Sequence, residues 1–262
     1  MAKLTLLPLG LLLILVIGSL LSLVFELDLT TLIQVLQEPE LFFAVMLSLG
    51  TALLSLLLSL LIAIPAGWAV ARMNFRGKDI VNMLLDIPLV TPPLIVGIGL
   101  LLLLGQRGPL ATVAPGLADV LFSPFGVVIA QTYVASAIIL RSASAAFSSI
   151  DPAFITTAWN LGLTPLRSLI LVEIPLCWHT LLGGSILALA RALGEFGATL
   201  MLAGATRLKT ETLPIAVYLN IASGDFSLAI GCALVLIFLA GILLLVLHRV
   251  QHIYKENVHA AR

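Results

Sequence analysis

The sequence predicts an all-α membrane protein with six transmembrane helices and both termini in the cytoplasm. Of the 262 residues, 61% are hydrophobic and only 10% are charged, whereas an ordinary globular domain has roughly 25% charged residues. The mean hydropathy is +1.19. Apolar residues gather in runs of about 20, the helix length that crosses a hydrocarbon core about 30 Å thick. Leu, Ile, Val and Ala dominate these runs without strand-like alternation, which favours a helical bundle over a barrel.

Six apolar runs are candidate spans of a single transmembrane domain, residues 1–262. The second, third and fifth runs are longer than a bilayer requires, so we expect tilts, kinks or frayed ends there. The first run follows Lys3 and could instead be a secretory signal peptide. The run is too long for the apolar core of a typical signal peptide, however, and no clean small-x-small cleavage site follows it. In chain order the runs are Leu4–Phe25, Phe42–Val70, Ile80–Leu104, Phe125–Ala146, Leu176–Gly204 and Phe226–Leu247.

The distribution of lysine and arginine predicts the orientation of the bundle. Three basic residues, Arg107, Arg207 and Lys209, lie in the connections on one side. Nine lie on the other side: Lys3, Arg72, Arg76, Lys78, Arg141, Arg167, Arg249, Lys255 and Arg262. An excess of positive charge marks cytoplasmic loops, so both termini and the connection 151–175 are predicted to be cytoplasmic. No basic run indicates nucleic acid as a partner.

Motifs for nucleotide binding and hydrolysis are missing from the sequence. Gly77-Lys78 is followed by Asp79 and has no upstream glycine at the spacing of a phosphate-binding loop. There is no Gly-x-Ser-x-Gly elbow and no Ser/His/Asp grouping. We therefore expect a chain that is not an enzyme and binds no cofactor itself. If ATP drives its function, another subunit supplies the ATPase.

The cysteines and histidines do not indicate a metal site. Cys177 and Cys232 are too few to hold a metal and are expected to be small buried apolar residues. His248, His252 and His259 share one helical face, at spacings of four and seven, but no zincin pattern accompanies them. The sequence therefore predicts no metal site.

The segment Asp151–Pro175 is the longest water-compatible interruption in the chain. Asp151 is a favourable N-cap and Pro152 a favourable first helical residue, which predicts a helix over Pro152–Leu161. This helix has no lysine or arginine, unlike helices that lie flat among lipid headgroups. Its apolar residues suit insertion into a groove on a soluble partner instead. They are Phe154, Ile155, Ala158, Trp159 and Leu161.

A second helix is predicted to return the chain to the membrane. Gly162 supplies the positive-φ residue that ends the first helix. Thr164 and Pro165 repeat the combination of cap and proline, which predicts a helix over Leu166–Ile174. Pro175 is expected to break the chain before the fifth span.

These residues resemble the EAA loop of bacterial ABC-importer permeases. The pattern of that family is Glu-Ala-Ala, three residues, Gly, nine residues and then Ile-x-Leu-Pro. This chain has Thr156-Thr157-Ala158, then Gly162, then Val172-Glu173-Ile174-Pro175, with every interval kept. Threonine replaces the glutamate and the first alanine, which removes a possible ion pair with the ATPase.

The resemblance implies a multi-pass protein of the inner (plasma) membrane that works within an ATP-driven complex. The short helix would be the coupling helix, which sits in a groove of the ATP-binding subunit. The implied partners are a second permease copy, two ATP-binding subunits that carry ATP and Mg²⁺, an external oxyanion-binding protein and membrane lipid. The implied coupling residues are Phe154, Thr156, Thr157, Ala158, Trp159, Gly162, Pro165 and Pro175.

Further stretches resemble one branch of this family. Ile87–Pro93, Gly105–Leu110 and Arg191–Thr199 are similar to signatures of the molybdate, tungstate and sulfate permeases. Thr212–Pro214 resembles the molybdate branch, whereas Ala205–Lys209 departs from the Asn-Ile-Pro-Gly of that branch. The resemblance implies import of molybdate or tungstate, with sulfate or thiosulfate as the alternative.

Six residues within or beside the apolar runs are candidates for the translocation path or gate. Arg191 and Glu195 are four apart and could pair on one helix face, either along the path or as a structural pair. A proline pair in the third run is expected to kink that span and shape a gate. Asp86 is expected near the cytoplasmic boundary. The six candidates are Thr91, Pro92, Pro93, Arg191, Glu195 and Thr199.

Two other functional classes are alternatives. A secondary transporter driven by an ion gradient tends to show inverted repeats and buried acidic groups, but the two halves share no repeat and Glu195 is the one plausible deep carboxylate. A membrane-embedded enzyme would need converging nucleophile, metal or acid–base residues within the spans, and the sequence offers none.

Overall fold

A computed structural model of the chain describes residues 6–110, 113 and 116–260, with side chains for all of these except 117 and 252–260. The ordered elements over these residues are helices, with no strand among them. Five helical stretches are long and apolar enough to cross a membrane. They are α1 (Leu6–Glu26), α3 (Pro39–Arg72), α7 (Pro124–Ser148), the stretch Pro165–Leu193 that ends in α10 (Ile174–Leu193), and α13 (Phe226–Ala260).

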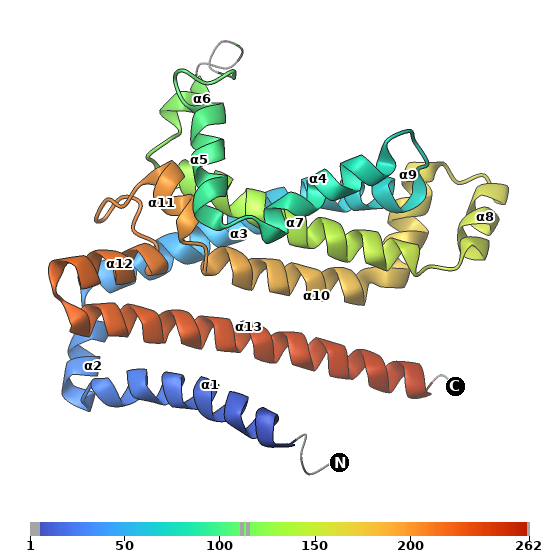
Figure 1. Cartoon of the computed structure of the whole chain (residues 1–262). Coiled ribbons are helices and arrows are strands. Elements are labelled where there is room, and N and C mark those ends of the chain that lie inside the picture. The colour runs from blue at the N-terminus through green and yellow to red at the C-terminus, as the bar shows by residue number, and fades with distance from the viewer. Residues whose placement is uncertain (1–5, 111–112, 114–115, 261–262) are drawn as a thin grey trace.

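The third predicted span, Ile80–Leu104, is not one straight helix. It is a pair of helices, α4 (Lys78–Val90) and α5 (Pro93–Leu104), bent by 115°. The break falls at Thr91, whose extended backbone (φ −77°, ψ 133°) is typical of a residue before proline. The two prolines that follow lack N–H groups and cannot continue the ladder of α4. In Figure 1, α5 points away from the long helices of the bundle.

The first and last helices of the described chain have their outer ends at the same end of the bundle. In Figure 1, α3, α7, α10 and α13 run roughly along one direction, and α4 follows them up to the bend. The start of α1, the end of α13 and α8 (Pro152–Asn160) lie toward one end, while α11 (Gly197–Ala203) and α12 (Leu213–Ser223) lie at the other. If the bent pair is counted as one span, the number of spans is six.

Several boundaries differ from the predictions. The fifth span was expected over Leu176–Gly204, but α10 ends at Leu193 and the short helix α11 follows after a break. Two of the connections between predicted spans contain helices, α2 (Leu29–Leu36) and α12, and a third contains the single turn α6 (Gly116–Asp119). Leu4 and Thr5, the predicted start of the first span, lie outside the described residues.

The centre of the bundle is the contact between α3 and α7. A stripe of small residues on α3 is buried there. The Ser55 hydroxyl donates to the Val128 carbonyl (3.1 Å) and the Ser59 hydroxyl to the Thr132 carbonyl (3.2 Å). Small side chains let two backbones approach closely, which is how helices associate where lipid removes the hydrophobic driving force. The stripe comprises Thr51, Ala52, Ser55, Ser59, Ala63 and Gly67, whereas the buried Ser48 accepts a hydrogen bond from the N–H of Leu213 in α12 (2.7 Å).

Helix α1 is the exception to this close packing. It contains 21 residues, and none of them is buried. Its one substantial neighbour in the bundle is α13. The apolar side chains of α1 therefore form a surface that lipid or another chain has to cover.

Gly67 provides a test of the α3–α7 contact. A Cβ at this position would lie 2.7 Å from the Cβ of Ala143, whereas a Cβ at Gly50, also on α3, would meet nothing within 4 Å. We expect Gly67→Ala to lower the free energy of unfolding by about 1–3 kcal/mol, the cost typical of overpacking. Gly50→Ala should be neutral or stabilising by up to about 1 kcal/mol. Unfolding in mixed micelles by a denaturing detergent measures both, and equal effects would contradict the contact.

Candidate functional site

The segment that links α7 to α10 forms an elbow with its own capped helix, α8. The carboxylate of Asp151 accepts a hydrogen bond from the backbone N–H of Ala153 (2.9 Å), as the N-cap prediction requires. Pro152 occupies the first helical position. The helix ends at Asn160, one residue before the predicted end, a difference within the usual uncertainty of helix boundaries.

Gly162 ends α8 in the predicted way. Its φ of +87° lies in the left-handed region. The N–H of Gly162 donates to the carbonyl of Trp159 (2.9 Å), and the N–H of Leu163 donates to that of Ala158 (3.1 Å). This pair of bonds is the Schellman motif, which satisfies carbonyls at a helix C-terminus. A side chain at position 162 would be strained because of this φ.

Helix α8 is buried on one face and exposed on the other. Ile155 and Ala158 are buried, and Ile155 packs in a cluster with Phe147 at the end of α7. Phe154 and Trp159 are 55% and 50% exposed. The predicted apolar face is thus divided between an anchor to the bundle and an exposed aromatic surface.

An apolar groove lies behind the exposed surface of α8. Its volume is about 420 Å³, and it separates α8 from the start of the helix that returns to the membrane. Residues of α8, several of them predicted coupling residues, line this groove together with Leu163 of the turn and Val172 of the returning helix. The lining is Ala153, Phe154, Thr157, Ala158, Leu161, Leu163 and Val172. Of the other predicted coupling residues, Thr156, Gly162, Pro165 and Pro175 are exposed.

The prediction of a chain break at Pro175 is wrong. The hydroxyl of Thr164 caps α9 (Pro165–Ser168), as predicted. The chain then forms a π-helical turn, η1 (Leu169–Glu173), and continues into α10 without interruption. The N–H of Ile174 donates to the carbonyl of Leu169, five residues back. This wider turn lets the helix pass Pro175, which has no N–H to contribute.

A buried ion pair at the base of the elbow was missed by the sequence analysis. Glu173 is fully buried, and its carboxylate accepts from Nε1 of Trp68 and Nε of Arg72, both at 2.9 Å. Nη2 of Arg72 also donates to the carbonyl of Phe147 (2.7 Å). The available signal was the spacing of Trp68 and Arg72, four residues apart on α3. From the sequence alone, Arg72 indicates only which side of the membrane is cytoplasmic.

The prolines of the third span lie against the start of α11. A Cβ on Gly197 would lie 2.9 Å from the backbone nitrogen of Leu94 and 3.1 Å from the Cβ of Pro93. Gly97 of α5 similarly abuts Ala198. The bend at Thr91–Pro92 and the break between α10 and α11 therefore form one region. The candidate path residues of the third predicted span and those of the fifth therefore lie together in this region.

Arg191 and Glu195 pair, at 2.6 Å between Nη1 and Oε2. Glu195 is fully buried, whereas the side chain of Arg191 is 37% exposed. The other oxygen of Glu195 accepts from the N–H of Ala198 (2.9 Å), so the carboxylate also caps the first turn of α11. Thr199, the remaining candidate, is buried one turn further on. The ion pair thus joins the end of α10 to the start of α11 across the break between them.

Asp86 also has a partner. Its carboxylate forms an ion pair with Arg141 of α7, and Arg141 donates to the backbone carbonyl of Asn82 as well. The pair ties α4 to α7 before the bend. The sequence predicts that Asp86 lies near a membrane boundary but not that it has this partner, which lies 55 residues further along the chain.

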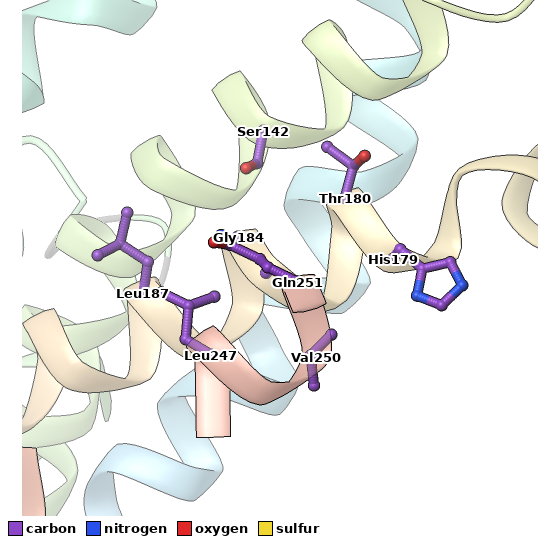
Figure 2. A pocket seen from close by; sticks show the side chains of 9 residues that line it. Ser142, His179, Thr180, Gly184, Leu187, Leu247, Val250 and Gln251 are labelled. Carbon is purple, nitrogen blue, oxygen red and sulfur yellow. The ribbon is translucent and has the colours of Figure 1, made fainter. Parts of the chain in front are cut away.

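Two cavities lie between the long helices. Figure 2 shows one of about 410 Å³ between α7, α10 and α13, lined by Ser142, His179, Thr180 and Gly184 among others. The second, of about 480 Å³, lies beside the α4–α5 bend and is almost entirely apolar. None of the six path candidates lines either cavity, but Ser136, a hydroxyl that the sequence places within a span and offers to a passing anion, lines the second.

The end of the bundle opposite the elbow has a polar cluster. Arg207 pairs with Glu40 and donates to Asn220 (3.0 Å) and Ser223 (3.0 Å). Glu211 is buried beside this cluster and accepts from the N–H of Leu208 (2.8 Å). Burial and the nearby carboxylate of Glu40 raise the pKa of Glu211 to about 7.

A bundle of apolar helices long enough to cross a bilayer defines a multi-pass membrane protein. Residues 63–258 match the family described as the inner membrane component of binding-protein-dependent transport systems. The chain belongs to this family of ABC-transporter permeases. It is accordingly a multi-pass protein of the inner membrane.

Relatives whose names state a transport function align with most of the chain. A "probable molybdenum ABC transporter permease protein" of Haloferax volcanii is 39% identical over 76% of this chain and 72% of its own length. The molybdenum transport system permease protein of Haemophilus influenzae is 35% identical over 67% of this chain and 77% of its own. A "probable sulfate transport system permease protein" of Anthoceros angustus is 25% identical over 87% and 79%.

Solved structures show the same fold. A bacterial alginate ABC transporter in complex with a periplasmic protein bound to an alginate pentasaccharide aligns with a TM-score of 0.72, at 16% identity. The alignment covers 97% of this chain and 94% of the other. At this identity the likeness concerns the fold alone.

The raised pKa of Glu211 predicts a pH-dependent stability. A carboxyl whose pKa rises on folding, here from about 4.5 to about 7, favours the folded state most when it is protonated. Its contribution is complete below about pH 4.5 and is lost as the pH rises through about 7. We expect the thermal midpoint in detergent to fall over this range and Glu211→Gln to flatten the fall. Glu38→Gln, which removes an exposed carboxyl at the same end, is the control. An identical pH profile for Glu211→Gln and the parent would contradict the assignment.

Proposed function

We propose that the chain is the membrane-spanning permease of an ABC importer that moves molybdate or tungstate into the cytoplasm. The observation that carries the proposal is α8, a rigidly capped helix with exposed Phe154 and Trp159 at the EAA-like position. Molybdenum permeases of 35–39% identity support the choice of substrate. In the proposed orientation α8 and both termini face the cytoplasm, in keeping with the basic residues on that side.

In the proposed complex, α8 sits in a groove of an ATP-binding subunit. Two such subunits, each with its own ATP and Mg²⁺, would engage two copies of this chain. Their closure would push the two elbows together and reorient the spans. An aromatic side chain that enters a desolvated pocket is the kind of contact that dominates interface energies. Trp159 is therefore the proposed main anchor, with Phe154 beside it.

The proposed path carries the anion without binding it tightly. Molybdate is a dianion, and an unpaired carboxylate beside it would repel it. Glu195 has its charge matched by Arg191 and one oxygen occupied by the N–H of Ala198. The partly exposed guanidinium of Arg191 gives a transient attraction, and Thr91 and Thr199 offer hydroxyls. Affinity would come from an external binding protein that delivers the anion.

The region where Pro93 meets Gly197 is proposed as the gate of this path. The bend at Thr91–Pro92 and the break after Leu193 lie on either side of that contact. Helix ends without a continuous ladder absorb backbone rotation at lower cost than unbroken helices. A change in the angle between α4 and α5 would separate the two segments and open the path.

Sulfate is the second candidate substrate, since a sulfate-permease relative matches 87% of the chain. The test is ATP hydrolysis by the complex reconstituted in liposomes with the ATP-binding subunit. Molybdate, tungstate and sulfate are each supplied on their binding protein. We expect molybdate and tungstate to stimulate hydrolysis and anion uptake. Stimulation by sulfate alone would reassign the substrate, and uptake under an ion gradient without an ATPase would indicate a secondary transporter.

Two substitutions in the elbow test the coupling helix. Trp159→Asp places a charge on the exposed aromatic surface, and Gly162→Pro is incompatible with φ of +87° at that position. We expect each to reduce ATP-driven uptake at least about 100-fold, the effect of losing an interface anchor worth about 3 kcal/mol. Uptake into liposomes and copurification of the ATP-binding subunit are the measurements.

Leu208→Asp is the matched control for Trp159→Asp. Leu208 is an equally exposed apolar residue (59%) at the opposite end of the bundle, so it should leave association with the ATP-binding subunit unchanged. Wild-type uptake by both elbow variants would contradict the assignment of α8.

A further inference from the structure

The structure points to Arg72 and Glu173 as positioning residues that join the elbow to the spans, so that a push on α8 moves α3, α7 and α10 together. We infer that this pair is the mechanical joint of the permease. The inference rests on the proposed function, since it concerns how the proposed coupling helix acts. It adds two residues that lie outside α8 and outside the exposed surface that would meet the ATPase.

Both ends of the elbow are held by one side chain. Helix α8 lies between Phe147, near the end of α7, and Glu173, at the end of η1. Arg72 donates through Nη2 to the carbonyl of Phe147 (2.7 Å) and through Nε to the carboxylate of Glu173 (2.9 Å). The chain leaves the bundle at one of these contacts and re-enters at the other. Arg72, the last residue of α3, therefore closes the base of the elbow.

The joint is buried, which gives it strength. Glu173 is fully buried and the side chain of Arg72 is 18% exposed. A buried carboxylate that loses its cation keeps an uncompensated charge in a medium of low dielectric, which is strongly unfavourable. Trp68 donates a further hydrogen bond to the same carboxylate (2.9 Å). Separation of α3 from η1 would break both contacts at once, so these elements move together.

The surroundings of the Arg72–Glu173 pair favour a role in passing movement from α8 to the spans. An apolar cluster beneath the elbow contains Ile155 of α8, Phe147 of α7 and Leu169 of η1, with Trp68 packed against it. The guanidinium of Arg72 reaches from α3 to the C-terminal end of α7, where the helix dipole favours a cation. Glu173 closes the π-helical turn, and such turns inside α-helices are frequent at functional sites. The polar joint and the apolar cluster thus act on the same three elements.

Loss of the joint should separate ATP hydrolysis from transport. Helix α8 keeps its own caps at Asp151 and Gly162 and its exposed Trp159, none of which contacts Arg72 through a hydrogen bond. An ATP-binding subunit would therefore still dock and hydrolyse ATP. The movement of α8 would be absorbed at the base of the elbow instead of reaching α3 and α7.

The experiment compares Glu173→Gln and Arg72→Lys in the full complex with its ATP-binding subunit and binding protein. Gln keeps the shape and can still accept from Trp68, but it removes the charge. Lys keeps the charge but lacks the planar fork that reaches two acceptors. We expect association with the ATP-binding subunit to persist in both variants. Anion moved per ATP hydrolysed should fall about tenfold, within the range of coupling between two sites.

A double variant separates a mechanical role from a merely structural one. Arg72→Met with Glu173→Leu replaces the ion pair by apolar side chains, an exchange that is often neutral or stabilising. We expect it to recover thermal stability but not the transport-to-ATP ratio. Asp86→Asn, which removes the α4–α7 ion pair away from the elbow, should keep the ratio within about twofold of the parent.

Each outcome decides the inference. A wild-type ratio in Glu173→Gln, or in the stable double variant, would overturn it. If the single variants prove unstable, the double variant alone decides, because its stability is measured in the same preparation. Failure of the proposed function looks different. In that case Trp159→Asp keeps the ATP-binding subunit bound and active, whatever the Glu173 variants do.

Discussion

The packing of α3 on α7 is the contact on which the rest of the bundle depends. A stripe of serine, alanine and glycine on α3 lets the two backbones meet, and Gly67 leaves no room for a methyl group beside Ala143. Helices α4, α10 and α11 in turn pack on α7. In a bilayer, apolar surface alone gives helices no reason to associate, so this close fit and the polar groups set the arrangement. The elbow and the bent pair are placed by this two-helix centre.

Four ion pairs among the described residues lie near places where the chain changes direction. Arg72 and Glu173 lie at the elbow, Arg141 and Asp86 beside the α4–α5 bend, Arg191 and Glu195 at the end of α10, and Arg207 and Glu40 at the far end. Ionised groups are costly at membrane depth unless they are matched. Pairing keeps the bundle close to neutral inside, which suits a chain proposed to pass a dianion without holding it.

Local signals were predictable from sequence, and distant partners were not. The caps of α8, the left-handed Gly162 and the Arg191–Glu195 pair depend on residues within four positions of one another, so the sequence predicts them. The proline pair predicts the kink in Ile80–Leu104, which the structure confirms, but not its angle of 115°, because α5 also packs on α11, which is distant in the sequence. Glu173 finds Trp68 and Arg72 about 100 residues away, and the π-helical turn that lets α10 include Pro175 has no pattern of its own.

The isolation of α1 has a consequence for the order in which the protein is made. Its main neighbour, α13, follows all the other described helices along the chain, so α1 meets it only after the spans between them have been made. Until then α1 is a lone apolar helix that lipid has to stabilise, and its 21 residues are long enough for that.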